Sequence, residues 1–318
     1  MHIPLEVIAQ IRQKTSHAAS PGMQALIATI MSRYGQSVQA VLYYGSCLRK
    51  DDELDGIVDV YVLVDTYRSA YLGHLLPAVF NKILPPNVFY LEVPFEGGTV
   101  RAKYAIVSVT DFLRGTSRRW FHSYMWGRFA QPTGLLYARS PEVEDRLINA
   151  LAQAAMTFIT RVLPRAAERF SARELWSRGL LLSYRAELRA ERPDKVASLY
   201  DTSSEHYEQI TRAALAEVPF PVEMEPDSKP VRYRARIPLR VRRYSRFTWA
   251  VRSLQGKLFS ILRLFKAWFT FRGGMDYILW KVERHSGVTV EVTPQLRRFP
   301  LLAVFVLSWR LYRRGAFR

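Results

Sequence analysis

A glycine–serine pair and an aspartate lie on two neighbouring apolar segments. Gly45 and Ser46 follow the β-prone residues 38–44, and Asp59 comes 13 residues after Ser46, inside the apolar segment 57–64. A glycine lets the backbone approach a phosphate closely, and a serine adds a hydroxyl and an amide donor. An aspartate on the adjacent strand can hold Mg²⁺ between phosphate groups. The spacing therefore predicts a site for a nucleoside triphosphate and Mg²⁺.

The surrounding segments predict an α/β (α+β) fold with a mixed sheet. We expect strands over 38–44, 57–64, 87–93 and 103–109, and helices over 4–35 (broken at 20–22) and 67–82. Further along, we expect helices over 118–130, 140–163, 171–191 and 203–216, a loop over 219–230, and a strand with an arginine face over 231–241. Together with the glycine–serine pair and the aspartate strand, this order resembles the polymerase-β-like nucleotidyltransferases. We therefore expect a nucleotidyltransferase domain over 1–139, a helical, winged-helix-like domain over 140–250, and a basic amphipathic region over 251–318.

Several motifs stand in an order that one protein family shares. They are Tyr44-Gly45-Ser46, Val58-Asp59-Val60-Tyr61, Asn87-Val88-Phe89-Tyr90, Lys103-Tyr104-Ala105-Ile106, Trp120-x3-Tyr124-x2-Gly127-Arg128-x2-Gln131-Pro132 and Leu182-Ser183-Tyr184-x2-Glu187-x-Arg189. In these motifs the chain resembles the mitochondrial-type phosphatidate cytidylyltransferases (the Tam41 family), including bacterial relatives. The resemblance implies transfer of CMP from CTP to phosphatidic acid, which yields CDP-diacylglycerol and pyrophosphate.

On the basis of this resemblance, the candidate site residues divide into two groups. Asp59 and Lys103 are the catalytic candidates, since a metal and a cation stabilise charge on a triphosphate. The nucleotide-binding candidates are Tyr44, Gly45, Ser46, Tyr124, Arg128, Glu187 and Arg189.

The second metal ligand is less plainly marked than Asp59. Polymerase-β-like enzymes usually carry another acid two residues after the first, but here Tyr61 stands in that place. We expect Glu92, near the middle of the next predicted strand, to supply the second carboxylate. Asp55 is the alternative.

The positive charge gathers at the C-terminal end. The whole chain carries a formal net charge of +18, and this excess lies within residues 229–318, whereas the first 228 residues are neutral. Residues 252–271 predict an amphipathic helix with large apolar side chains on one face and cations on the other. Such a region suits an anionic membrane surface. The membrane-binding candidates are Lys257, Arg263, Lys266, Trp268, Arg310, Arg313 and Arg314.

Composition and the N-terminal sequence indicate in which cellular compartment the protein is expected. One cysteine, Cys47, excludes an internal disulfide and favours a reducing compartment. The N-terminus lacks the apolar run of a signal peptide, and no apolar stretch reaches the length of a membrane span. We therefore expect a cytoplasmic protein that is peripheral on the inner face of the cell membrane.

Two other functions stay open at this point. The chain could be a nucleotidyltransferase that acts on RNA or on a soluble acceptor, or a catalytically inactive adaptor that binds lipid. The large apolar face of the predicted helix argues against a nucleic-acid partner, since RNA-binding arms are usually polar. A second copy of the chain, forming a homo-oligomer, also stays open as a partner.

Overall fold

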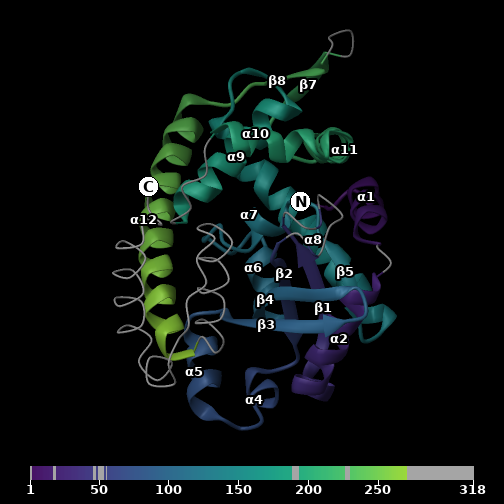
Figure 1. Cartoon of the computed structure of the whole chain (residues 1–318). Helices are drawn as coiled ribbons and strands as arrows, with labels where there is room; N and C mark the ends of the chain where they lie inside the picture. The colour runs from purple at the N-terminus through teal and green to yellow at the C-terminus, as the bar shows by residue number, and fades with distance from the viewer. Residues whose placement is uncertain are drawn as a thin grey trace, which may run out of the picture.

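The central element of the computed structural model is a five-stranded sheet in the order β3-β4-β2-β1-β5 (Figure 1). The structure describes residues 2–16, 19–45, 48, 54, 56–187, 193–225 and 230–270. The strands are β1 (Val38–Tyr44), β2 (Val58–Val64), β3 (Asn87–Phe95), β4 (Gly98–Ser108) and β5 (Gly134–Ala138). β2 and β4 are parallel, and the other neighbours are antiparallel. The expected mixed α/β fold is confirmed.

Helices cover both faces of this sheet, because successive side chains of a strand point to opposite faces and nearly all those of β1 and β2 are buried. The face that carries Leu42 and Leu63 belongs to the same apolar cluster as the N-terminal helix and three later helices. These are α1 (Leu5–Thr15), α6 (Val109–Thr116), α7 (Trp126–Phe129) and α8 (Pro141–Val162). The opposite face, which carries Val41 and Val62, packs against α2 (Pro21–Tyr34).

α8 is the core helix that joins the sheet to the rest of the protein. Ser140 caps it by accepting a hydrogen bond from the amide of Val143, as the sequence predicts. Within the described residues it is the one helix long and apolar enough to cross a membrane, and 78% of its apolar window is buried inside the protein. Its apolar character is therefore explained by packing.

The second half of the chain combines helices with a small antiparallel sheet in the order β6-β8-β7. Its elements are α9 (Ala172–Ala186), α10 (Pro193–Asp201), α11 (Ser204–Leu215), β6 (Arg169–Ser171), β7 (Val222–Glu225) and β8 (Arg232–Ala235). The arginine face expected here pairs with acids: Arg234 contacts Glu225, and Arg236 just beyond β8 contacts Glu223. Two arginines of that face therefore form ion pairs with acids of the neighbouring strand β7.

A long helix, α12 (Leu239–Thr270), runs along one side of the molecule (Figure 1). It extends from the small sheet toward α5 (Leu75–Ile83). Gly256 allows it to approach the end of α9, because a β-carbon there would stand 2.0 Å from the carbonyl oxygen of Ala186. The amphipathic helix that the sequence predicts over 252–271 is thus part of a longer helix, which begins at Leu239.

The helix expected over 118–130 is wrong over most of its length. The chain instead forms α6 earlier and then turns through 117–125 before the short α7. His122 contributes to this difference, since its Nδ1 accepts the amide N–H of Tyr124 at 3.2 Å. A side chain that takes a backbone donor in this way competes with helical hydrogen bonding.

Other elements also differ from the expectation, and β5, β6 and α10 were not expected at all. The helix over 67–82 is divided into α4 (Tyr67–Ala70) and α5, because Leu72 and Gly73 adopt φ values of 49° and 79°. The loop over 219–230 contains β7, whose residues pair with β8. The strand over 231–241 stops at Ala235, since Pro238 precedes the first turn of α12.

Candidate active site

Four residues form a row across the sheet, one on each of four adjacent strands. Tyr44 on β1 lies opposite Asp59 on β2, Asp59 lies opposite Lys103 on β4, and Lys103 lies opposite Tyr90 on β3. Directly paired residues project their side chains from the same face of a sheet. Adjacent strands are about 4.8 Å apart, so Asp59 and Lys103 are neighbours. Within the described part of the chain neither has a hydrogen-bond or ion-pair partner.

Gly45 ends β1 directly against the carboxylate of Asp59. It has a φ of 98°, and a β-carbon at this position would stand 3.1 Å from Asp59 Oδ2. A positive φ and a crowded β-carbon both require glycine here. The missing side chain leaves the carboxylate open on one side. The structure thus brings together the glycine and the aspartate that the sequence singled out.

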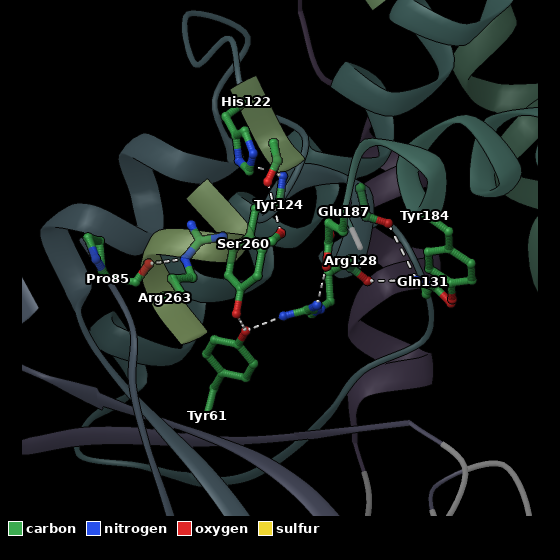
Figure 2. A network of polar contacts seen from close by, with 12 residues as sticks. Tyr61, Pro85, His122, Tyr124, Arg128, Gln131, Tyr184, Glu187, Ser260 and Arg263 are labelled. Atoms are coloured by element: carbon green, nitrogen blue, oxygen red, sulfur yellow. Dashed lines mark hydrogen bonds and ion pairs between the residues drawn. The ribbon is translucent and has the colours of Figure 1, made fainter. Parts of the chain in front are cut away.

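A buried network of polar side chains lies beside this row (Figure 2). Arg128 is its centre: one end of its guanidinium donates to Tyr61 Oη at 2.6 Å, and the other donates to Glu187 Oε2 at 2.8 Å. Tyr61 and Tyr124 share a hydrogen bond of 2.9 Å between their hydroxyls. Arg128 and Glu187 are 9% and 7% exposed. The network therefore ties β2 and α7 to the end of α9.

Tyr44 connects the row to the network. Its ring centre lies 5.4 Å from that of Tyr61, and the guanidinium of Arg128 lies 5.6 Å from the Tyr44 ring. The same guanidinium lies 4.2 Å from the ring of Tyr124. Tyr124 and Arg128 are four residues apart, so the helix expected over 118–130 would place them on one face. They meet even though Tyr124 lies in a turn.

Charge affects the two tyrosines of the network differently. Burial raises the pKa of Tyr61 well above its ordinary value. Burial alone would do the same to Tyr124, but the guanidinium groups of Arg128 and Arg263 outweigh it and lower the pKa. Tyr124 therefore lies in the more positive part of the network, where an anionic group is stabilised.

Two cations that the sequence assigned to membrane contact lie on the inner side of α12, Arg263 at this site and Lys266 beside the turn at 84–86. The guanidinium of Arg263 lies 3.9 Å from the Tyr124 ring, and its Nε donates to the carbonyl of Pro85 at 3.1 Å (Figure 2). Lys266 is 6% exposed and donates to the carbonyls of Leu84 and Pro86. Burial, and then Arg263, lower the pKa of Lys266 to about 7. In the structure, Arg263 and Lys266 therefore contact the protein itself.

Glu92, the expected second metal ligand, is not brought to Asp59. It lies on β3, where it accepts a hydrogen bond from Tyr90 Oη at 2.7 Å and pairs with Arg101 at 3.4 Å. Its role as a metal ligand has no support in this geometry. Asp55, Ser46, Arg189, Arg310, Arg313 and Arg314 lie outside the described residues, as does the side chain of Trp268. Lys257 is exposed on α12.

Tyr61 and Arg263 are the site residues that the sequence did not assign to the site. Tyr61 follows Asp59 by two positions, and residues two apart on a strand share a face. That spacing was the available signal for Tyr61. No signal of this kind existed for Arg263, because its contact joins α12 to a turn more than a hundred residues earlier.

His122 makes the stability of this region sensitive to pH. Burial, and then Arg263, Arg252 and Arg128, lower its pKa to about 3. An ordinary histidine titrates near about 6.5, so the unfolded chain takes up this proton first. The free energy of unfolding therefore falls as the pH drops from about 6.5 toward about 3.

We expect His122→Gln to reduce the stability loss between about pH 7 and about pH 5 by up to about 2 kcal/mol, measured by urea unfolding. Glutamine keeps an acceptor near the Tyr124 amide but does not titrate. His2→Gln, at an exposed position, is the control. An unchanged pH dependence in His122→Gln would contradict a buried neutral imidazole.

A mixed sheet that sets a glycine close to an aspartate, beside a lysine and a buried arginine, is the arrangement that the sequence led us to expect of a nucleotidyltransferase. Residues 66–237, more than half of the chain, match the family described as mitochondrial phosphatidate cytidylyltransferase, and the chain belongs to this family. It is therefore an enzyme that transfers CMP from CTP to phosphatidate. Gly45 and Asp59 precede the matched segment, so the match does not include them, and the structure shows that they lie close together.

Comparison with solved structures finds the crystal structure of a nucleotidyltransferase-like protein from Exiguobacterium sibiricum. The identity is 14% and the TM-score 0.26, over 77% of this chain and 79% of that chain. No curated protein matches the chain in sequence. The family assignment rests on the family match alone.

Proposed function

We propose that CMP transfer takes place at the row of Tyr44, Asp59 and Lys103, with the predicted Mg²⁺ held at Asp59. An oxygen of the phosphatidate phosphate attacks the α-phosphorus of CTP and forms a new P–O bond. The bond from the α-phosphorus to the bridging oxygen breaks, and pyrophosphate leaves. The observation that supports this assignment is the close approach of Gly45 to the Asp59 carboxylate, which leaves no room for a side chain at position 45, one strand away from Lys103.

The residues present fit a hard divalent cation. Asp59 offers carboxylate oxygens, and the absent side chain of Gly45 leaves room on that side. Mg²⁺ is usually bound by one or two carboxylates together with the phosphates of the substrate, so a single aspartate is an adequate protein contribution. When bound, the ion supplies neutralisation of the negative charge that develops on the triphosphate.

The remaining side chains of the site bind and orient the substrates. Lys103 lies opposite Asp59 on the neighbouring strand, from where its ammonium can neutralise phosphate oxygens without covalent chemistry. Tyr124 and Arg128 offer an aromatic ring and a guanidinium for the cytosine ring and a phosphate. Glu187 holds the guanidinium in place from the end of α9.

The experiment that tests this function is an assay with CTP, Mg²⁺ and phosphatidate in mixed micelles. We expect CDP-diacylglycerol and pyrophosphate in equal amounts. Lipid without a phosphate, diacylglycerol, is the matched control and gives neither. CTP binding without either product would redirect the activity to RNA or to a soluble acceptor. No CTP binding at all would leave a lipid-binding adaptor.

We also propose that the enzyme works as a peripheral protein on an anionic membrane surface, at the inner face of the cell membrane. The outward face of α12 is apolar: Leu254, Leu258 and Phe265 are 73%, 53% and 66% exposed. α5 adds Leu76 and Ile83, at 73% and 74% exposed. Neither α12 nor the segment 66–83 contains an aspartate or glutamate. An acid-free apolar face suits an interface with anionic lipid.

We expect Leu254→Glu to weaken binding to vesicles that contain phosphatidate by at least about tenfold, from lost apolar burial and added like charge. Leu5→Glu is the matched control, because Leu5 is also 73% exposed but lies on α1. Vesicle flotation measures the binding. Equal flotation of the two variants would exclude the outer face of α12 from the contact.

A further inference from the structure

A cavity of about 650 Å³ lies in the second half of the chain, among the start of α12, α9 and the short helix η2 (Leu163–Arg165). Four arginines line it: Arg165 from η2, Arg178 from α9, and Arg242 and Arg246 from α12. Four cations in one cavity are unusual without acids to balance them, because like charges repel.

The single carboxylate in the cavity wall already has another role. Glu174 accepts hydrogen bonds from the backbone N–H of Ser171 at 2.7 Å and from its hydroxyl at 3.1 Å, which completes the capping box of α9. Its nearest arginine outside the cavity is Arg232, at 4.0 Å. Within the described residues, no ion pair neutralises the four arginines of the cavity.

The cavity wall also contains buried polar groups that lack a hydrogen-bond partner in the described part of the chain. These groups are Arg165 Nε and Ser177 Oγ. Arg242 is fixed, since it donates to the carbonyl of Ala166 at 2.6 Å. Burial, and then the charges of Arg178 and Arg246, lower the pKa of Arg165. A bound anion would satisfy both buried donors and remove the repulsion.

We propose that this cavity is a second anion site, which binds a phosphate group. Guanidinium groups bind phosphate through paired, charge-assisted hydrogen bonds, and several converge here. The apolar side chains of Phe170, Leu181 and Val196 complete the wall. They suit a phosphate that is attached to an apolar body as well as a free phosphate.

The second anion site is separate from the catalytic row and goes beyond the proposed function. On α12, Arg246 lines the cavity and Arg263 contacts Tyr124. Seventeen residues of helix place these two positions about 25 Å apart along the axis. No lining residue of the cavity belongs to the Arg128 network.

The test uses the full chain and the double variant Arg178→Gln/Arg246→Gln. Both side chains are exposed at the rim, so the fold is expected to survive. The matched control is Arg68→Gln/Arg146→Gln, which removes two exposed arginines outside the cavity. Titration with inorganic phosphate and flotation with phosphatidate vesicles are compared with flotation on phosphatidylcholine vesicles alone.

We expect the cavity variant to lose about tenfold or more in phosphate-dependent binding, and the control variant to stay close to wild type. A loss with both probes identifies a site for phosphate in general, and a loss with vesicles alone identifies a lipid headgroup. Without phosphate, the cavity variant is expected to melt no lower than wild type, because repulsion is relieved. Equal binding of the two double variants to both probes would overturn the proposal.

Discussion

Replacing Asp59 with asparagine is expected to reduce CTP turnover at least about a thousandfold while the protein stays folded. Asparagine keeps the shape of the side chain but removes the negative charge that a divalent cation requires. Asp59 is half-buried and has no partner in the described part of the chain, so little packing or hydrogen bonding is lost. Turnover is measured with CTP, Mg²⁺ and phosphatidate, and folding by the thermal transition of the variant.

The matched control for this experiment is Asp65→Asn. Asp65 follows the end of β2, where it accepts hydrogen bonds from the amide of Thr66 and the hydroxyl of Ser69. Six residues of strand place it about 20 Å from Asp59, too far to share an ion. We expect this control to keep most of its turnover. Turnover like wild type in Asp59→Asn would remove the proposed metal site from the row.

The second large effect is expected at the buried pair of Arg128 and Glu187. Arg128→Met should lower the free energy of unfolding by about 3–5 kcal/mol, because Glu187 is then left buried and unpaired. The double variant Arg128→Met/Glu187→Gln should recover part of this loss, since no buried charge remains. Urea unfolding of the single and double variants gives the coupling energy between the two side chains.

An exposed ion pair on α9 provides the comparison for this pair. Arg173 donates to Asp201 at 2.9 Å and 3.0 Å, with side chains 55% and 50% exposed. Arg173→Met is expected to cost about 1 kcal/mol or less, since water screens exposed pairs. A loss of the same size in Arg128→Met would show that the Arg128 network does not stabilise the fold.

Activity separates the two functions of the Arg128 network. Arg128 contacts Tyr44 in the row as well as Tyr61 and Glu187. The double variant should therefore recover stability but not CTP turnover. Recovery of both would restrict Arg128 to a structural role.

The sheet was predictable because its signals are local. The buried segment 57–64 and the hairpin turn at 96–98 predict adjacent strands, and both are observed. The close approach of Gly45 to Asp59 follows in the same way from the prediction that the strands over 38–44 and 57–64 are neighbours. By contrast, the turn over 117–125 depends on the hydrogen bond of the His122 side chain, which no periodicity reveals.

The orientation of α12 could not be predicted from its pattern. A helical wheel separates Leu254 and Leu258 from Arg263 and Lys266, but it does not say which side meets the protein. In the structure Leu254 and Leu258 face outward, whereas Arg263 and Lys266 face inward and contact backbone carbonyls and an aromatic ring. The role of Glu92 could not be predicted either. Its ion pair with Arg101 depends on the register of the β3–β4 hairpin, which the sequence does not reveal.

The two faces of α12 have a thermodynamic consequence. Its inner face holds Tyr124 through Arg263 and the 84–86 turn through Lys266, and its outer face carries exposed leucines. If the outer face binds a lipid surface as proposed, one helix takes part in two binding equilibria, and such linkage is reciprocal. A lipid surface that favours the docked position of α12 would then raise nucleotide affinity, and bound nucleotide would strengthen lipid binding by the same factor. Such coupling would make CTP binding tighter at the surface where the lipid substrate is concentrated.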